Sequence, residues 1–389
     1  MPHAGARERS PAQASGALQA LAAVSHGKAP ALTHCRHMFD LHGMVQFASG
    51  DRPDLTHGYC LDDNARALLV AVMVLSLVPA NDVATEIGER ALAFAHTCRR
   101  PDGRFHNLMS ADGSFTDDVG SQDSLARLIW ACGVTARCAP YQGWRDGALA
   151  LLESALEHAS DLQALRPIAY ATLGLAALVA PGDASPLASV VPAPTGPFAQ
   201  RITQTLRGMC ARLIAELHAN SAGTWRWFEP MLSWGNARLP EALLRASVAL
   251  PDSPLLPESG LTSLAFLGSI THSGDRFVPI GNHGWYERGS RRAIYDQQPI
   301  EACTMVDAWL AAARLTDRIE YESKALEAFS WFVGLNTEGL ALADEASGGC
   351  HDGLAPGEIN PNMGAESTLS FLHAHAALAA HLKAKVLTP

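Results

Sequence analysis

The chain has 389 residues, of which 48% are apolar and 17% are charged. This length and composition allow one large domain or two ordinary ones with a substantial core, and they differ from the polar composition of a disordered chain. The net charge of −10 excludes the basic surface that binding to a phosphate backbone requires. We therefore expect no nucleic-acid partner.

The sequence contains no apolar run of transmembrane length, and its first residues lack the basic-then-apolar pattern of a signal peptide. The eight cysteines form no C-x-x-C pair, so we predict neither a disulfide framework nor a metal site. Reduced thiols and the missing leader favour a cytoplasmic protein without membrane association. Because phosphate-binding loops and dinucleotide fingerprints are also absent from the sequence, we expect no cofactor.

Long stretches rich in Ala, Leu and Val alternate with short segments rich in Gly, Asp, Asn and Trp. The long stretches exceed the usual length of strands and contain strong helix formers, so the sequence predicts an all-α protein. The predicted helices include residues 63–79, 82–99, 121–138, 143–158, 163–179, 200–218, 299–316, 318–334 and 365–385.

Six predicted helices begin directly after, or within, a segment that we call a leading loop. The six leading loops are residues 57–66, 120–124, 165–167, 234–241, 295–301 and 360–367. These starts are marked by Asp62, Asp123, Pro167, Pro240, Pro299 and Glu366. Repeats of roughly sixty residues leave room for one returning helix between successive loops. Six such hairpins in a ring form an (α/α)6 toroid, in which the leading loops meet at one central cleft. An open solenoid, the alternative, would show more uniform periods. We assign residues 31–389 to a single toroid domain and residues 1–30 to a ragged N-terminal segment.

The leading loops and neighbouring turns contain many carboxylates, amides, tyrosines and tryptophans. Tryptophan faces stack on sugar rings, while acids and amides bind hydroxyls, so this mixture suits a carbohydrate cleft. Cleavage of a glycosidic bond also needs two carboxyl groups, one protonated and one acting as base or nucleophile. Glu229 follows Trp227 and Phe228, whose rings would desolvate its charge, so we predict that Glu229 is the general acid. Asp296 and Asp63 are the candidates for base or nucleophile.

The other candidates are predicted to bind substrate, with the tryptophans among them as sugar platforms. They are His57, Tyr59, Asp62, Arg66, Asp123, Trp227, Trp234, Asn236, Glu241, His283, Trp285, Gln297, Glu301, Asp352, Asn362 and Glu366. Structural roles compete with some of these predictions. Either Asp62 or Asp63 could be a helix N-cap, and Glu301 and Glu366 could stabilise a first helical turn.

Seven segments of the chain carry a resemblance to a known family. They are residues 33–40, 43–48, 57–68, 227–229, 236–243, 296–302 and 364–368. They resemble a bacterial family of six-hairpin glycosidase-like proteins that often occur beside, or fused to, retaining glycosyltransferases. The resemblance spans roughly residues 33–380 and implies an (α/α)6 toroid with carbohydrate as ligand, without assigned catalytic residues. Phe47 departs from the histidine expected at its position.

These observations favour a carbohydrate-active enzyme, a glycoside hydrolase that acts on an oligosaccharide or polysaccharide. A sugar epimerase or isomerase on the same fold is one alternative, in which histidines such as His57 and His283 would transfer protons. A non-catalytic glycan-binding partner of a glycosyltransferase is the other.

Overall fold

The computed structural model describes residues 21–22, 24, 26–181, 191–274 and 276–387. Within these residues it contains twelve α-helices and a set of short strands. The fold is therefore all-α, as the sequence predicts. The boundary predicted at residue 30 lies near residues outside this description and stays a prediction.

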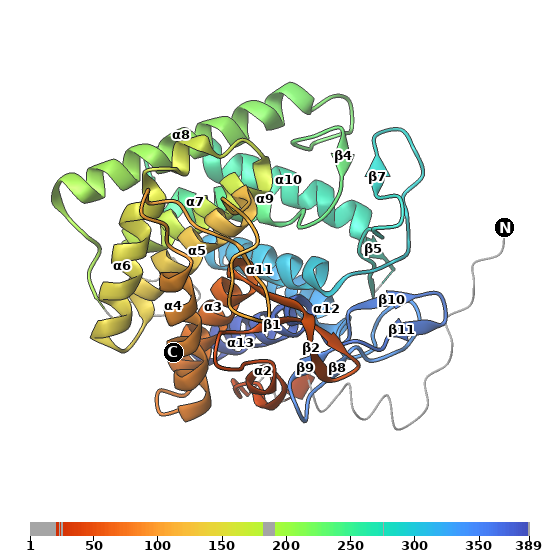
Figure 1. The fold of residues 1–389 in the computed structure, drawn as a ribbon. Helices are drawn as coiled ribbons and strands as arrows, with labels where there is room; N and C mark the ends of the chain where they lie inside the picture. Colours follow the sequence, from red (N-terminus) through yellow and green to blue (C-terminus); the bar gives the residue numbers. More distant parts are fainter. Residues whose placement is uncertain (1–20, 23, 25, 182–190, 275, 388–389) are drawn as a thin grey trace.

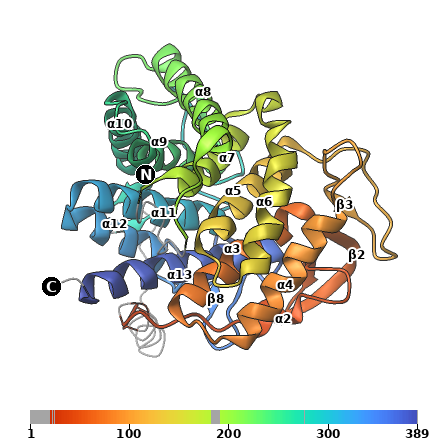
Figure 2. The ribbon, with the colours of Figure 1, turned by 90° about the vertical axis from the view of Figure 1, so that its left-hand side faces the viewer.

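Six helices form an inner ring that surrounds the axis of the molecule (Figure 2). They are α3 (Leu61–Leu77), α5 (Gln122–Cys138), α7 (Leu165–Val179), α9 (Arg238–Ala249), α11 (Pro299–Thr316) and α13 (Ala365–Leu387). Each packs against the next in sequence, and α13 packs back against α3. The ring is thus closed, which distinguishes this (α/α)6 toroid from an open solenoid.

Five helices pack outside this ring and return the chain to its other end (Figure 2). They are α4 (Asp82–Thr97), α6 (Gln142–Leu156), α8 (Gly196–Asn220), α10 (Leu255–Thr271) and α12 (Ile319–Ser330). The inner helices are buried almost all round, whereas each outer helix has an exposed face. Repeated hairpins of one inner and one outer helix explain the repeat of roughly sixty residues.

Local signals set the starts of the inner helices. Cys60, and neither of the two following aspartates, is the N-cap of α3, because its side chain accepts a hydrogen bond from the amide of Asp63. Ser121 caps α5 in the same way, and Pro299 occupies the first position of α11, where its missing N–H costs nothing. The first-turn aspartates of α3 are therefore not needed as caps.

Short strands and loops gather at the end of the ring where the inner helices begin, on the right of Figure 1. β1 (Val45–Ser49), β2 (Arg52–Cys60) and β3 (Leu108–Met109) form one antiparallel sheet, and β2 leads directly into α3. Four two-stranded sheets pair β4 (Met231–Leu232) with β7 (Tyr286–Glu287), β5 (His272–Ser273) with β6 (Arg276–Phe277), β8 (Ala343–Asp344) with β9 (Gly349–Cys350) and β10 (Gly353–Ala355) with β11 (Glu358–Asn360). A five-residue helix, α2 (Thr33–His37), and a 3-10 turn, Ala159–Asp161, complete the described elements.

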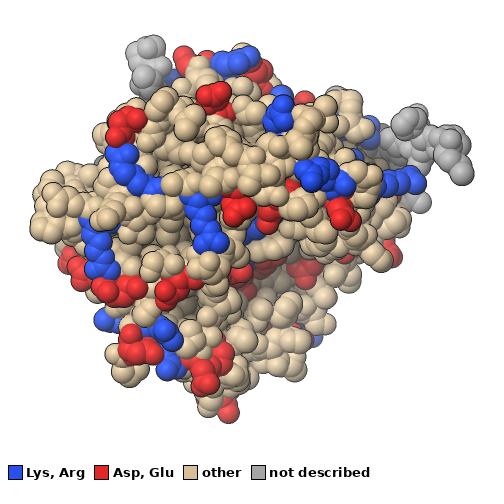
Figure 3. All heavy atoms as spheres, turned by 90° about the horizontal axis from the view of Figure 1, so that it is seen from above, with Lys and Arg blue, Asp and Glu red and all other residues tan. Residues whose placement is uncertain are grey.

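Three further features of the described residues are the charge of the surface, the state of the cysteines and the hydropathy of the helices. Lys and Arg are interspersed with Asp and Glu over the face in Figure 3. All eight cysteines are buried and free. Among the described residues, no helix is both long and apolar enough to cross a membrane.

Two glycines allow α5 and α7 to pack closely in the inner ring. A Cβ atom added at Gly133 would lie 2.2 Å from the carbonyl oxygen of Gly174, and one added at Gly174 would lie 2.4 Å from that of Ile129. Both obstacles are backbone atoms, which cannot turn aside as a side chain can. The close approach of these helices therefore depends on glycine at both positions.

The Gly133→Ala variant is expected to lower the free energy of unfolding by about 1–3 kcal/mol, because α5 must move away from α7. Gly208→Ala, on the exposed face of α8 with no atom within 4 Å of the added Cβ, is the control. It should raise stability by about 0.5–1 kcal/mol. Urea unfolding of both variants measures the difference, and equal effects would contradict the proposed helix contact.

Candidate active site

Ion pairs join the first turns of three inner helices at the leading end of the ring. Arg66 on α3 binds Asp63 at 3.1 Å and Glu366 on α13 at 2.6 Å, and lies 3.7 Å from Asp62. Arg127 on α5 binds the same oxygen of Asp62, Oδ2, at 2.6 Å. The leading loops of α13, α3 and α5, which are far apart in sequence, thus meet at one place as predicted.

A second group of contacts joins α7, α9 and α11. Arg166 on α7 pairs with Glu229 and donates to the carbonyl of Trp234 at 2.9 Å and to Asn236 at 3.2 Å. The amide of Asn236 donates in turn to Glu301 on α11 at 3.4 Å, and Glu301 also accepts from the backbone of Gly235. Glu301 therefore ties the first turn of α11 to the leading loop of α9.

Trp234 and Tyr170 connect the two groups. The guanidinium of Arg127 lies 4.5 Å from the ring centre of Tyr170 and 5.5 Å from that of Trp234, and Arg166 lies 6.0 Å from Trp234. Trp234 is half-buried. Cations already neighbour its ring, so a sugar that stacks on it would also meet guanidinium donors.

Two carboxyls on adjacent inner helices have pKa values that shift in opposite directions. Burial alone would raise the pKa of Asp62, but the positive charges of Arg127 and Arg66 outweigh it and lower this pKa. Burial raises the pKa of Asp123, and the charge of Asp62 adds to the rise. In each side chain Oδ1 is buried without a hydrogen-bond partner among the described residues. The surroundings thus shift the two pKa values in opposite directions, that of Asp62 downward and that of Asp123 upward.

Asp63 and Glu301 are more deeply buried than these two carboxyls. Burial raises the pKa of Asp63 to about 7, and the charge of Asp62 adds to this, although Arg66 opposes it. Burial also raises the pKa of Glu301 to about 7, against the hydrogen bond from Gly235. Both side chains are held by protein groups, Asp63 by Arg66 and the thiol of Cys60 at 3.1 Å. Asp63 therefore helps to hold Arg66 in place, and Glu301 helps to hold the leading loop of α9 in place.

The Asp63→Asn variant is expected to gain stability relative to the wild type as the pH rises. The folded protein holds the Asp63 proton up to about pH 7, while the unfolded chain releases it near pH 3.8. The wild type therefore loses stability between these two values, and the asparagine variant does not. Urea unfolding of both proteins at about pH 5 and about pH 8 measures this change. A difference in unfolding free energy that is independent of pH would contradict it.

Several predicted residues lie on the surrounding strands and loops. His57 is exposed on β2, and its ring meets the edge of Phe47 on β1 at 4.7 Å between centroids. Asn362 accepts from the amide of Gly50 at 3.0 Å, and Asp352 accepts from that of Gly364 at 2.9 Å. The first bond holds the leading loop of α13 against the turn between β1 and β2, and the second ties this loop to the residue before β10.

Asp296 and its neighbours lie in the loop that leads into α11. Asp296 is half-buried, and burial raises its pKa, while the nearby His283 acts to lower it. His283 is exposed and Trp285 is half-buried. Asp296 thus combines partial exposure, which lets a ligand reach its carboxyl group, with a raised pKa.

Five of the residues that are predicted to bind substrate are buried. Tyr59, Trp227, Asn236, Glu241 and Gln297 are each exposed by 1% or less. Four of them are bound internally: the Tyr59 hydroxyl donates to Asp40, Gln297 accepts from Trp331 at 2.7 Å, Glu241 binds Arg238 at 2.5 Å, and Asn236 binds as described above. Trp227 packs edge-on against Phe228. Their burial does not support direct contact with a sugar, which stays a prediction for these five residues.

Glu229 also differs from its prediction. The sequence places it after aromatic residues, but Trp225, Trp227 and Phe228 are buried in the core. The carboxylate of Glu229 instead pairs with Arg166 and is 29% exposed. The aromatic rings that were expected to desolvate Glu229 thus lie in the core and an arginine binds its carboxylate, so the basis for the predicted general acid is absent.

The sequence analysis missed Arg127, Arg166 and Tyr170. A signal existed for the first: Asp123 and Arg127 are four residues apart at the start of a helix, as are Asp62 and Arg66. This spacing puts both members of each pair on one helix face. The repetition in two successive leading loops could have identified a shared arrangement. For Tyr170, inside an apolar helix, no comparable signal exists.

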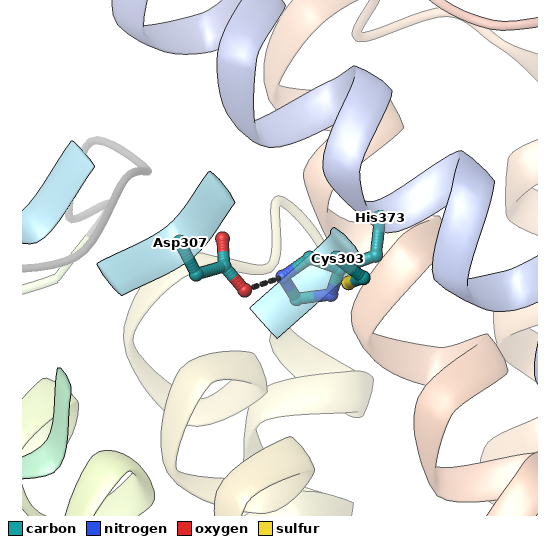
Figure 4. Close-up of side chains that lie close together, drawn as sticks. All are labelled: Cys303, Asp307 and His373. Atoms are coloured by element: carbon teal, nitrogen blue, oxygen red, sulfur yellow. Dashed lines mark ion pairs between the residues drawn. The ribbon is translucent and has the colours of Figure 1, made fainter. Parts of the chain in front are cut away.

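One group of side chains has the composition of a metal site. Cys303 and Asp307 on α11 lie close to His373 on α13, and all three are buried (Figure 4). However, Arg238 binds Asp307 at 2.6 Å and lies 3.8 Å from the sulfur of Cys303. The guanidinium thus supplies the positive charge that a metal ion would bring, so these residues do not fit a metal centre well.

Comparison with known proteins supports the fold. No protein-family model and no curated relative match the sequence. A cellobiose 2-epimerase from Spirochaeta thermophila is similar in structure, with a TM-score of 0.68, 14% identity and coverage of 97% of this chain and 98% of that one. A D-mannose isomerase gives a TM-score of 0.64 at 11% identity, covering 97% of this chain and all of the other. A GH76 α-mannanase from Bacteroides thetaiotaomicron gives 0.58 at 9% identity, covering 97% of both chains. At these identities the shared feature is the toroid fold.

Proposed function

We propose that this protein is a carbohydrate-active enzyme, a glycoside hydrolase that acts on an oligosaccharide or polysaccharide at the leading end of the ring. The observation that carries the proposal is the pair Asp62 and Asp123. These carboxyls lie on adjacent inner helices, interact electrostatically, and have pKa values that move apart. Opposed shifts of two neighbouring carboxyls are the pattern that separates a catalytic base from a catalytic acid.

In this proposal Asp123 donates its proton to the glycosidic oxygen as the bond to the anomeric carbon breaks. Ionised Asp62 is the nucleophile or the base that activates water, and the anomer released first distinguishes these two roles. Arg66 and Arg127 hold Asp62 in place. Asp296, whose pKa burial also raises, is the second candidate for the acid. The α-mannanase fold neighbour adds support for a glycan substrate.

The test is incubation of the purified protein with a panel of oligosaccharides, including mannans and cellobiose-type glucans, with release of reducing ends as the readout. Turnover that disappears in Asp62→Asn would support the hydrolase. Binding without turnover would instead favour a non-catalytic glycan-binding partner of a glycosyltransferase.

A sugar epimerase or isomerase is the second candidate. Its support is His373, which lies at the axis of the ring with Nε2 at 2.7 Å from Asp307. A carboxylate that orients an imidazole is a common arrangement for proton transfer. The epimerase and isomerase fold neighbours point the same way. Incubation of cellobiose and mannose in D2O tests it, because proton transfer at C2 would place deuterium on that carbon.

A further inference from the structure

A small hollow lies on the axis of the ring, and all six inner helices line it. Each helix contributes at least one side chain that can donate a hydrogen bond: Arg66, Arg127, Tyr170, Arg238, Cys303 and Ser370. The free space between them is about 20 Å³, which is room for one or two groups the size of a water molecule.

The lining of the hollow is positively charged. Three guanidiniums, those of Arg66, Arg127 and Arg238, border it, and none of the described carboxylates does. The acids that pair with these arginines, such as Asp62 and Asp307, bind them from outside the lining. The charged side chains that line the hollow are therefore these three arginines, and His373, which pairs with Asp307, is also part of the lining.

Two of these arginines have donors without acceptors. Nε of Arg127 and Nε of Arg238 are buried, and neither has a hydrogen-bond partner among the described residues. Both side chains are only 4% exposed. Their other nitrogens are used, in Arg127 by Asp62 and Tyr170. A buried N–H group without an acceptor is unfavourable, so a ligand that accepts hydrogen bonds from these two arginines would relieve this cost.

We propose that the axial hollow is a binding site for a small inorganic anion of the size of chloride, held by Arg127 and Arg238. A water molecule fits less well, because it must donate two hydrogen bonds as well as accept them, and the lining consists mainly of donors. The hydroxyls of Tyr170 and Ser370 can turn their hydrogens toward an anion. Larger anions such as sulfate exceed the free space. This site does not depend on the proposed function, since it can be tested without any sugar.

The direct test is a crystal grown or soaked in bromide, examined for anomalous scattering. We expect one bromide between Arg127 and Arg238. In solution, the chloride-35 NMR line should broaden in the presence of the protein and narrow again when bromide competes. A water or an empty hollow at high bromide concentration, with no excess line width, would overturn the proposal.

Variants separate this site from general attraction of anions to the protein. Arg127→Met removes one charged donor and should weaken halide binding by about tenfold or more. Ser370→Val fills the hollow without changing charge and should also weaken it, which keeps the test open if the first variant does not fold. Arg207→Met is the control, because Arg207 is an exposed arginine on α8 paired with Asp252 at 2.7 Å. Equal loss of binding in Arg207→Met and Arg127→Met would rule out a specific site.

Discussion

The Asp62→Asn variant is expected to lose about 100-fold or more of the rate of glycoside hydrolysis while remaining folded. The Asp62 carboxylate binds Arg127 through Oδ2 at 2.6 Å, and its Oδ1 has no partner among the described residues. Asparagine can keep the first contact but cannot serve as a nucleophile or base. Initial rates on the best substrate of the panel, together with the melting temperature, measure the two effects separately.

Asp123→Asn should give a different kinetic pattern, because its proposed role is to protonate the leaving group. Hydrolysis of natural glycans should fall by about 100-fold, whereas aryl glycosides, whose leaving groups need little protonation, should lose much less. In the wild type, activity should decline at high pH as Asp123 loses its proton, since burial raises its pKa. This high-pH decline should disappear in Asp123→Asn.

Asp146→Asn is the matched control for both variants, because Asp146 is exposed on α6 and bound only by Gln142 in the described contacts. It should keep the wild-type rate. A folded Asp62→Asn protein with undiminished turnover would reject the assignment of the base. A rate lost only in Asp296→Asn would transfer the role of acid to that residue.

The toroid could be predicted because its signals are local. Helix length, the helix formers and the proline at the start of α11 depend on neighbouring residues, and the predicted helix 121–138 differs by one residue from Gln122–Cys138. The order of the leading loops then implied their convergence, since alternate helices of a closed ring run in the same direction. The two-residue shift of α3, predicted to begin at 63 and observed from Leu61, arose because cysteine acts as its N-cap.

The site was predicted less well because the environment of a side chain depends on residues distant in sequence. Glu229 was judged by its aromatic neighbours in the chain, but its ion-pair partner, Arg166, belongs to another hairpin. The aromatic and acidic composition of the segment around Trp227 suggested a platform for a sugar ring, yet this side chain is fully buried. The two aspartates of α3 were correctly placed in a leading loop, but only the position of Arg127 explains how their environments differ.

The structure also shows how the acidic residues of the leading loops are paired. The acids of the leading loops do not make this end of the ring uniformly negative, because Asp62, Glu229 and Glu366 are each paired with an arginine. Asp123 and Asp296 have raised pKa values, and among the described residues neither forms an ion pair with an arginine or lysine. The leading end of the ring therefore carries arginines as well as acids, and both kinds of group can bind the hydroxyl groups of a neutral sugar.

The Arg238→Met variant is expected to lower the free energy of unfolding by about 3–5 kcal/mol, because it leaves buried carboxylates with fewer cations. Arg238 binds Glu241 at 2.5 Å and Asp307 at 2.6 Å, and both carboxylates are completely buried. Its guanidinium also lies 4.6 Å from the ring centre of Trp130. Methionine keeps much of the volume but none of the charge. Urea unfolding at neutral pH measures the loss.

A second substitution shows whether the loss comes from the unpaired charge. Burial would raise the pKa of Asp307, but His373 and Arg238 together hold it well below its usual value. In Arg238→Met/Asp307→Asn the charge of Asp307 is removed, while Glu241 keeps its ion pair with Arg245. The double variant should therefore be more stable than the sum of the single effects predicts. Arg207→Met, at an exposed pair, should cost less than about 1 kcal/mol. If the two single effects simply add, Arg238 stabilises the ring by packing on Trp130 and not by neutralising Asp307.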